Sequence, residues 1–213
     1  MTRRMKAWRR IWRLAVLMRR DRSGIAAVEF AVIAPIMLVL FFGVVEITNG
    51  VAAYRDVSIM AHTLSDLTSQ SETVQDSDLT NFFNASTGVM YPYVTSTTDP
   101  NLKQSIAELW VNSSLQARVQ WAVNSDGSTP AAQGTVVAVP SALQVANTYV
   151  IYSSASYLYK PTGGIGYVMD KAGVNLSDFA YTRPRQSQCV YYYDAANPPP
   201  NPFPTPAPPC PTN

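Results

Sequence analysis

A run of twenty-one residues, 25–45, constrains this chain more than any other feature of its sequence. Within the run only Glu29 is charged, and only Pro35 interrupts the helical pattern. As an α-helix rising 1.5 Å per residue, the run would be about 31 Å long, which is close to the hydrocarbon thickness of a bilayer. The run therefore predicts a single membrane-spanning helix, and we expect Pro35 to bend it because proline removes one backbone hydrogen bond.

Charge is distributed unevenly on the two sides of this run. The whole chain has a formal net charge of +2. Residues 1–24 contain nine basic residues and one acidic residue, a net charge of +8, whereas the remainder contains seven basic and thirteen acidic residues, a net charge of −6. A basic flank is retained on the cytoplasmic side of a membrane. We therefore expect a cytoplasmic N-terminus and a domain on the opposite side.

The basic leader, residues 1–24, is open to two interpretations. Arginine-rich arms often bind nucleic acid. Here, however, Trp8, Ile11, Trp12 and Leu14 lie among the arginines, a pattern typical of an amphipathic segment on an anionic leaflet. We favour the membrane over nucleic acid as the partner. An ordinary cleaved secretory signal fits poorly, because the charged region is long and no A-x-A-like site ends the apolar run.

The beginning of the apolar run carries a specific motif. Gly24 follows the basic cluster directly, and Glu29 places a carboxylate inside the run. A charge at the bilayer centre costs roughly 2.5–3.5 kcal/mol on insertion scales, and less near the edge, so Glu29 needs a reason to be there. The sequence from Gly24 through Ile25-Ala26-Ala27-Val28-Glu29-Phe30 resembles the processing site of type IV pilins and pseudopilins.

This resemblance implies roles for four residues. A prepilin peptidase would cut after Gly24, and Ile25 would become an N-methylated N-terminus. Glu29, with Phe30 beside it, would serve subunit assembly by pairing with the terminal amine of a neighbouring subunit. Such pairing is physically reasonable, because an ammonium and a carboxylate in a low-dielectric site are each costly alone and less costly together. The alternative is an uncleaved signal anchor with an incidental glutamate.

Helical periodicity continues beyond the run. Apolar and small residues recur at spacings of three and four at Ile47, Val51, Tyr54, Ser58, Ala61, Leu64 and Thr68. One helix from about Ser23 to about Gln70 would be roughly 72 Å long. Residues 25–45 would lie in the membrane, and residues 46–71 would extend outward and pack on a small domain.

Residues 72–194 are expected to form that domain. Residues 71–78 have the composition of a turn, and Asp78 is placed to cap a short helix over residues 79–90. Alternation of apolar and polar residues predicts a strand over 115–123, joined by a turn at 125–128 to a second strand at 134–139. Two further stretches, 149–160 and 189–194, are rich in β-branched and aromatic residues. The expected fold class is α+β, with a long N-terminal helix and a small antiparallel β-sheet domain, as in pilins.

Several stretches of the body narrow the resemblance to one family. It is similar to the TadE-like minor pilins, or pseudopilins, of tight-adherence pili at residues 61–70, 90–93, 119–121, 157–161 and 181–185. The resemblance implies a protein of the inner membrane with a periplasmic domain, whose partners are a prepilin peptidase, other pilins and the pilus assembly platform. Its function would be to initiate or assemble a pilus used in surface attachment. The alternative is a bitopic envelope protein with an adhesive or receptor-like ectodomain that never joins a filament.

The C-terminal region contains both cysteines of the chain. Cys189 and Cys210 lie in the part expected outside the cytoplasm, where disulfides form. A bridge between them would close a proline-rich loop, while two unpaired thiols remain the alternative. Residues 195–213 have the composition of an exposed polyproline-II-like tail.

Other functional classes find little support in the sequence. The chain has one histidine, His62, and no C-x-x-C spacing, so we expect no metal site and no cofactor. Residues 66–70 lack the second serine of a D-x-S-x-S metal motif. No nucleophile and base pair or phosphate-binding glycine loop stands out, so we expect neither an enzyme nor a small-molecule substrate.

Overall fold

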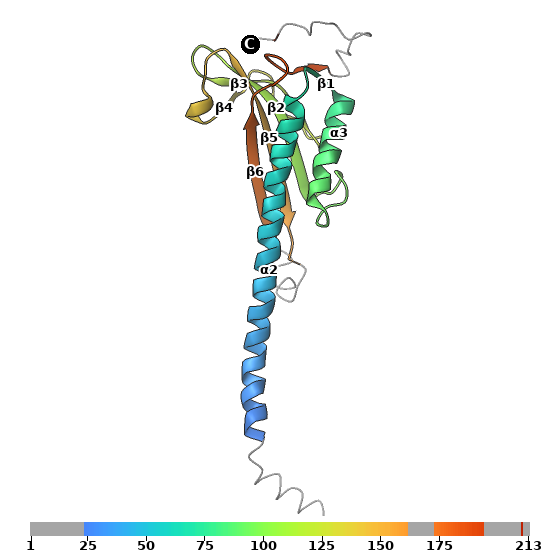
Figure 1. Cartoon of the computed structure of the whole chain (residues 1–213), viewed down its shortest axis with the longest axis vertical. Helices are drawn as coiled ribbons and strands as arrows, with labels where there is room; N and C mark the ends of the chain where they lie inside the picture. The colour runs from blue at the N-terminus through green and yellow to red at the C-terminus, as the bar shows by residue number, and fades with distance from the viewer. Residues whose placement is uncertain (1–23, 162–172, 194–209, 211–213) are drawn as a thin grey trace, which may run out of the picture.

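The computed structural model describes residues 24–161, 173–193 and 210. Its architecture is a long N-terminal helix with a small α+β domain attached along the outer half of that helix (Figure 1). This arrangement confirms the fold class expected from the sequence.

Helix α2 (Gly24–Ser69) comprises 46 residues and includes Pro35. Its described ends lie within one residue of the limits expected from the sequence. An 18-residue window of the helix has a mean hydropathy of 2.6, and none of that window is buried. The helix is therefore compatible with a single-pass membrane anchor.

The main sheet has five antiparallel strands in the order β4-β3-β2-β5-β6. The strands are β2 (Leu102–Val111), β3 (Ala117–Asn124), β4 (Val136–Val137), β5 (Thr148–Tyr159) and β6 (Val174–Thr182), and a short 3-10 helix, η2 (Ser141–Leu143), precedes β5. The expected hairpin is present as β3 and β4, although β4 is only two residues long. Strands β2 and β6 were not predicted.

The segment between α2 and the sheet corrects two expectations. Residues 71–78 are not simply a turn, because they contain strand β1 (Thr73–Gln75), in which Val74 is buried. The second helix, α3 (Asp76–Thr87), begins two residues before Asp78 and is followed by the 3-10 helix η1 (Gly88–Met90). Asp78 is not the N-cap: its carboxylate accepts a hydrogen bond from the backbone N–H of Gln75, the actual N-cap, at 3.1 Å.

The last expected strand is shorter than predicted and lies outside the main sheet. Strand β7 (Tyr191–Tyr193) pairs in parallel with β1 in a separate two-stranded sheet. A chain segment near the C-terminus thus lies beside the segment that follows α2. This pairing places Val190 against the core beneath α3.

Helices α2 and α3 cover one face of the main sheet. Two clusters of buried side chains fill the space between helices and sheet, one around Met60 and Leu102 and one around Leu64 and Ile106. A third cluster, around Leu109 and Val150, lies on the opposite face of the sheet. The domain therefore packs on the outer half of α2. The inner half contributes to none of these clusters.

Candidate functional site

The four candidate residues at the start of the apolar run lie in the first two turns of α2. They are Gly24, Ile25, Glu29 and Phe30. Ile25 is 55% exposed and Phe30 is 68% exposed. No atom lies within 4 Å of the position that a Cβ on Gly24 would occupy. Glu29 is exposed and makes no hydrogen bond or ion pair with any described residue. The structure therefore brings these residues together in the first two turns of the helix, where Glu29 has no partner among the described residues.

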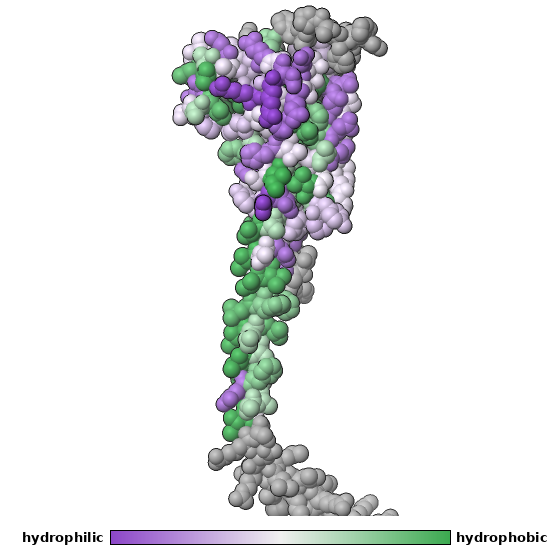
Figure 2. Space-filling model, viewed as in Figure 1, coloured by the Kyte–Doolittle hydropathy of each residue, from purple (hydrophilic) through white to green (hydrophobic). Residues whose placement is uncertain are grey.

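The inner half of α2 is apolar on all sides. Every large apolar side chain from Ile25 to Val45 is at least 40% exposed. Figure 2 shows this hydrophobic surface along the lower part of the helix, in contrast with the mostly polar domain above it. An apolar surface of this extent marks a membrane or protein interaction site. The fold alone leaves it without a covering partner among the described residues.

The outer half of α2 is held tightly on strands β5 and β6. Ala53, Val57, Met60, Ala61 and Leu64 each have no exposed surface, and their spacings of three, four and one place them on one helix face. Small side chains at two of these positions allow close approach. The hydroxyl of Ser153 on β5 donates a hydrogen bond to the carbonyl oxygen of Ala61 at 2.7 Å, and this bond is fully buried.

This buried stripe corrects the pattern expected from the sequence. Ile47, Val51 and Tyr54 were expected to pack on the domain, but they are 69%, 65% and 47% exposed. The sheet reaches α2 on a neighbouring face, where burial begins at Ala53. Ala61, Leu64 and Thr68, from the same expected series, are buried, so the periodicity was right for the distal part of the helix and wrong only for its first part.

A polar contact marks the junction between the two halves of α2. The hydroxyl of Tyr159, at the end of β5, donates a hydrogen bond to Glu46 Oε2 at 3.2 Å. Nearby, the hydroxyl of Tyr93 donates to the carbonyl oxygen of Asn49 at 3.2 Å. Burial, followed by the negative charge of Glu46, raises the pKa of Tyr159 to about 12. Glu46, which the sequence left without a defined role, fixes the foot of the domain to the end of the apolar run.

A buried carboxyl group that the sequence did not predict lies at the other end of the domain. Glu108 has no exposed surface. Its Oε1 accepts a hydrogen bond from the N–H of Val190 at 2.6 Å, and its Oε2 accepts one from the indole N–H of Trp121 at 3.2 Å. The same indole N–H also donates to the carbonyl oxygen of Val190 at 2.8 Å. Burial raises the pKa of Glu108 to about 8, and the two hydrogen bonds oppose this increase. Glu108 thereby anchors the segment that leads into β7.

The two cysteines form a disulfide directly beside this anchor. Cys189 is bonded to Cys210, 21 positions later in the chain. This settles the alternative between a bridge and two free thiols. The proline-rich tail, apart from Cys210, lies outside the described residues.

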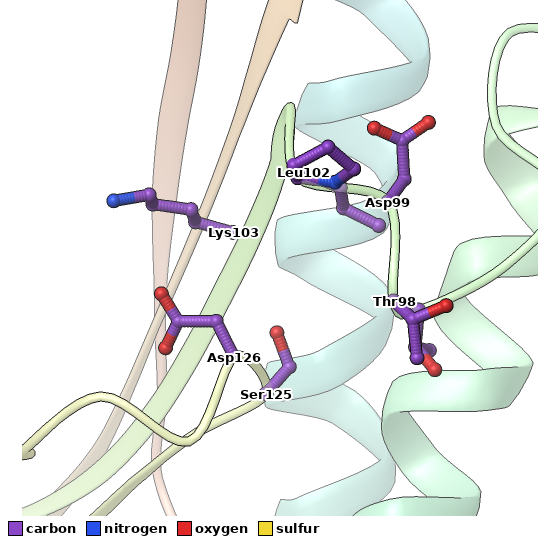
Figure 3. Close-up of a pocket in the computed structure, with 8 residues that line it drawn as sticks. Thr98, Asp99, Leu102, Lys103, Ser125 and Asp126 are labelled. Atoms are coloured by element: carbon purple, nitrogen blue, oxygen red, sulfur yellow. The ribbon is translucent and has the colours of Figure 1, made fainter.

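A polar pocket of about 300 Å³ lies near the beginning of β2. Figure 3 shows Lys103 and Asp126 on one side of it and Thr98 and Asp99 on the other. Asp126 accepts hydrogen bonds from the backbone N–H and the hydroxyl of Ser128, and these bonds lower its pKa. These carboxylate contacts stabilise the turn after β3 and do not form a catalytic arrangement.

Two further residues considered from the sequence lie on the outer half of α2. His62 is exposed. Asp66 forms an ion pair with Arg185 and accepts a hydrogen bond from the side-chain amide of Gln70 at 2.7 Å. Within the described ranges, no group of three or more His, Cys, Asp or Glu side chains is arranged to hold a metal ion.

Most of helix α2 matches the model of a known protein family. Residues 24–63 match the model of a family described as TadE-like protein. The matched region begins at Gly24 and includes the apolar run, the junction at Glu46 and the first part of the buried stripe. The match covers 40 of the 213 residues and supports a likeness of this helix to TadE-like proteins. Comparison with curated proteins and with solved structures gave no match.

Proposed function

We propose that this TadE-like protein is a membrane-inserted minor pilin, or pseudopilin, that takes part in the assembly or initiation of a tight-adherence pilus used in surface attachment. The observation that carries the proposal is the division of α2 at Glu46. One face of the outer half, from Ala53 onward, is buried in its own domain, whereas every large apolar side chain of the inner half is exposed. The inner half is therefore available for lipid first and for the helices of other subunits afterwards.

The motif at the start of α2 supports processing by a prepilin peptidase. Gly24 is sterically open, and Ile25 begins the apolar surface. Cleavage between them would remove the basic leader and create an ammonium group at Ile25. Because Glu29 has no partner among the described residues, it is available for the terminal amine of an adjacent subunit. Pairing would offset the desolvation of both charges.

The charge distribution supports an orientation for the protein. The leader, residues 1–24, has a net charge of +8, and the remainder of the chain has a net charge of −6. The positive-inside rule then places the leader in the cytoplasm and the domain in the periplasm, with α2 in the inner membrane.

The pairing role of Glu29 is tested by the substitution Glu29→Gln, which removes the charge and preserves the shape. We expect normal membrane insertion and normal cleavage, together with loss of the protein from sheared pilus material or loss of the pili themselves. Glu72→Gln is the matched control, because Glu72 is an exposed glutamate of the domain. Pili of normal number and composition with Glu29→Gln would contradict the pairing role.

Deletion of the chain distinguishes the proposal from a bitopic receptor or adhesin. A minor pilin or an assembly pseudopilin is required for normal piliation, so its deletion should reduce the number of pili. An ectodomain that never joins a filament should leave pili intact. Fractionation then separates the two pilus roles, since a filament subunit is released by shearing and an assembly subunit stays in the membrane.

A further inference from the structure

An apolar groove of about 370 Å³ lies where α2 meets the foot of the domain. Its lining comes from α2, from the end of β5 and from the beginning of β6, and includes Ile47, Val51, Tyr54, Tyr159, Val174 and Leu176. We refer to these six residues as the base surface. Val174 is 47% exposed, and the three α2 residues are at least as exposed. Among the described residues of the lining, Glu46 is the only charged one, and its carboxylate accepts the hydrogen bond from Tyr159.

The lower part of the base surface, around Ile47 and Val51, lies at the height of lipid headgroups if residues 25–45 span the bilayer. Gly50, in the middle of the groove lining, is five residues beyond Val45, which is roughly 8 Å along a helix. The headgroup layer on each side of a bilayer is roughly 5–8 Å thick. Side chains on α2 also tilt toward its N-terminus, which is the direction of the membrane. Figure 2 shows hydrophobic surface continuing from the lower helix to the foot of the domain.

Two tyrosines of the groove lining are each followed in the sequence by a basic residue. Tyr54 is followed by Arg55, and Tyr159 is followed by Lys160. Arg55 and Lys160 are exposed, and neither forms an ion pair within the described part of the chain. Tyrosine is enriched at membrane interfaces, and long basic side chains there extend toward phosphate groups. An apolar groove whose tyrosines are followed by exposed cations has chemistry compatible with contact to an anionic phospholipid.

We propose that the base surface is a contact site for anionic phospholipid of the leaflet on the domain side, with its apolar side chains in the interfacial layer and with the long side chains of Arg55 and Lys160 extending toward the phosphate groups. The proposal rests on the proposed insertion of α2 into the membrane. It adds that the foot of the domain also contacts the membrane. The foot of the domain is then seated in the membrane, which fixes its orientation before assembly. A neighbouring subunit that later packs on this surface must displace the lipid.

Spin labels at three positions test this seating in the full chain reconstituted into vesicles. Because Cys189 and Cys210 are joined in a disulfide, a single engineered cysteine provides a unique labelling site. Val174→Cys reports on the base surface. Phe179→Cys, which is 54% exposed five residues further along β6, is the matched control. Val32→Cys, 64% exposed in the apolar run, reports separately on insertion of α2.

For each position, the collision rate of the spin label with oxygen, which partitions into lipid, is compared with its collision rate with a water-soluble nickel chelate. At a low protein-to-lipid ratio in phosphatidylglycerol vesicles, we expect the oxygen-to-nickel ratio to be several-fold higher at position 174 than at position 179. A ratio at 174 equal to that at 179 overturns the proposal, as does lipid-like accessibility only when copies are crowded, which would assign the groove to a second copy. Water-like accessibility at position 32 would instead refute the membrane insertion on which the proposed function depends.

The charge component has its own test. In the Val174→Cys protein, Arg55→Gln with Lys160→Gln should lower the oxygen-to-nickel ratio in phosphatidylglycerol vesicles to the value found in phosphatidylcholine vesicles. Lys103→Gln, which removes an exposed lysine near the beginning of β2, is the control and should leave the ratio unchanged. An equal ratio in the two lipids for the protein with both cations intact would contradict recognition of anionic headgroups.

Discussion

The hydroxyl of Tyr159 donates a hydrogen bond to Glu46 across 113 positions of the chain, at an oxygen–oxygen distance of 3.2 Å. This contact joins the last residue of β5 to the first charged residue after the apolar run. It divides α2 into an inner half that is exposed and an outer half that becomes buried a few residues later. Together with the hydrogen bond from Tyr93 to the carbonyl oxygen of Asn49, it joins the end of the apolar run to the foot of the domain.

Tyr159→Phe tests this coupling. Loss of the hydrogen bond leaves the Glu46 carboxylate without one of its donors, and we expect a loss of roughly 1 kcal/mol of local stability. Hydrogen exchange of the full chain in detergent should become faster around residues 46–53, with less change near Leu64. Tyr54→Phe is the control, because Tyr54 makes no described hydrogen bond. Unchanged exchange at residues 46–53 would show that the contact does not hold the junction.

Ala61→Leu tests the close approach of α2 to the sheet. Ala61 has no exposed surface, and its carbonyl oxygen accepts the hydrogen bond from Ser153. A larger side chain must push the helix from β5, at a cost of roughly 1–3 kcal/mol in the free energy of unfolding. Ala52→Leu, on the exposed side of the same helix, should change stability little. Equal midpoints of thermal unfolding for the two variants would argue against the close packing described for α2.

The raised pKa of Glu108 predicts that the stability of the folded protein depends on pH. Its pKa is raised to about 8 in the folded protein from a value of 4.5. Between these values the folded state binds a proton that the unfolded state has released, so this group's contribution to stability is fully present below about pH 4.5 and declines as the pH rises through about 8. The full decline should be on the order of 5 kcal/mol.

Denaturant unfolding between pH 5 and 8 measures this effect. Glu108→Gln removes the proton exchange, so its stability should depend less steeply on pH than that of the natural protein, even though it loses a hydrogen bond. Glu72→Gln, at an exposed position, should retain the natural slope. If Glu108→Gln and the natural protein have parallel pH profiles, Glu108 does not carry a raised pKa.

Local patterns in the sequence predicted the long helix and the hairpin of β3 and β4. The apolar run and its continuation set the limits of α2, because hydropathy and helical periodicity need no tertiary information. Alternation over residues 115–123 likewise predicted β3. Each of these features depends on neighbouring residues alone.

Strand β2 escaped prediction because its buried face contains polar residues. Gln104 and Glu108 alternate with Leu102 and Ile106 on that face, and all four are buried. Their partners are distant in sequence: the side-chain amide of Gln104 donates to Thr87 Oγ1 at 2.6 Å, and Glu108 accepts from Trp121 and Val190. No local pattern identifies a polar residue as buried when its partners come from other elements.

Of the candidate site, the sequence predicted the residues but not their surroundings. Gly24, Ile25, Glu29 and Phe30 were identified from a motif, and the structure places them on an open helix end. The exposure of Ile47, Val51 and Tyr54 was not foreseen, because periodicity does not show where along the helix the contact with the domain begins. The structure places the first buried residue of α2 at Ala53, whereas Ala61 and Leu64 of the predicted series are buried.

The central claim, that this chain is a processed pilin-like subunit, is tested most directly by the mature N-terminus. The full chain is expressed with and without a prepilin peptidase, and its N-terminus is determined by sequencing and intact mass. We predict that the peptidase shortens the chain by residues 1–24 and leaves Ile25, N-methylated, as the first residue, and that Gly24→Leu blocks this cleavage. An intact Met1 in the presence of active peptidase, or a mature start at any residue other than Ile25, would contradict the account.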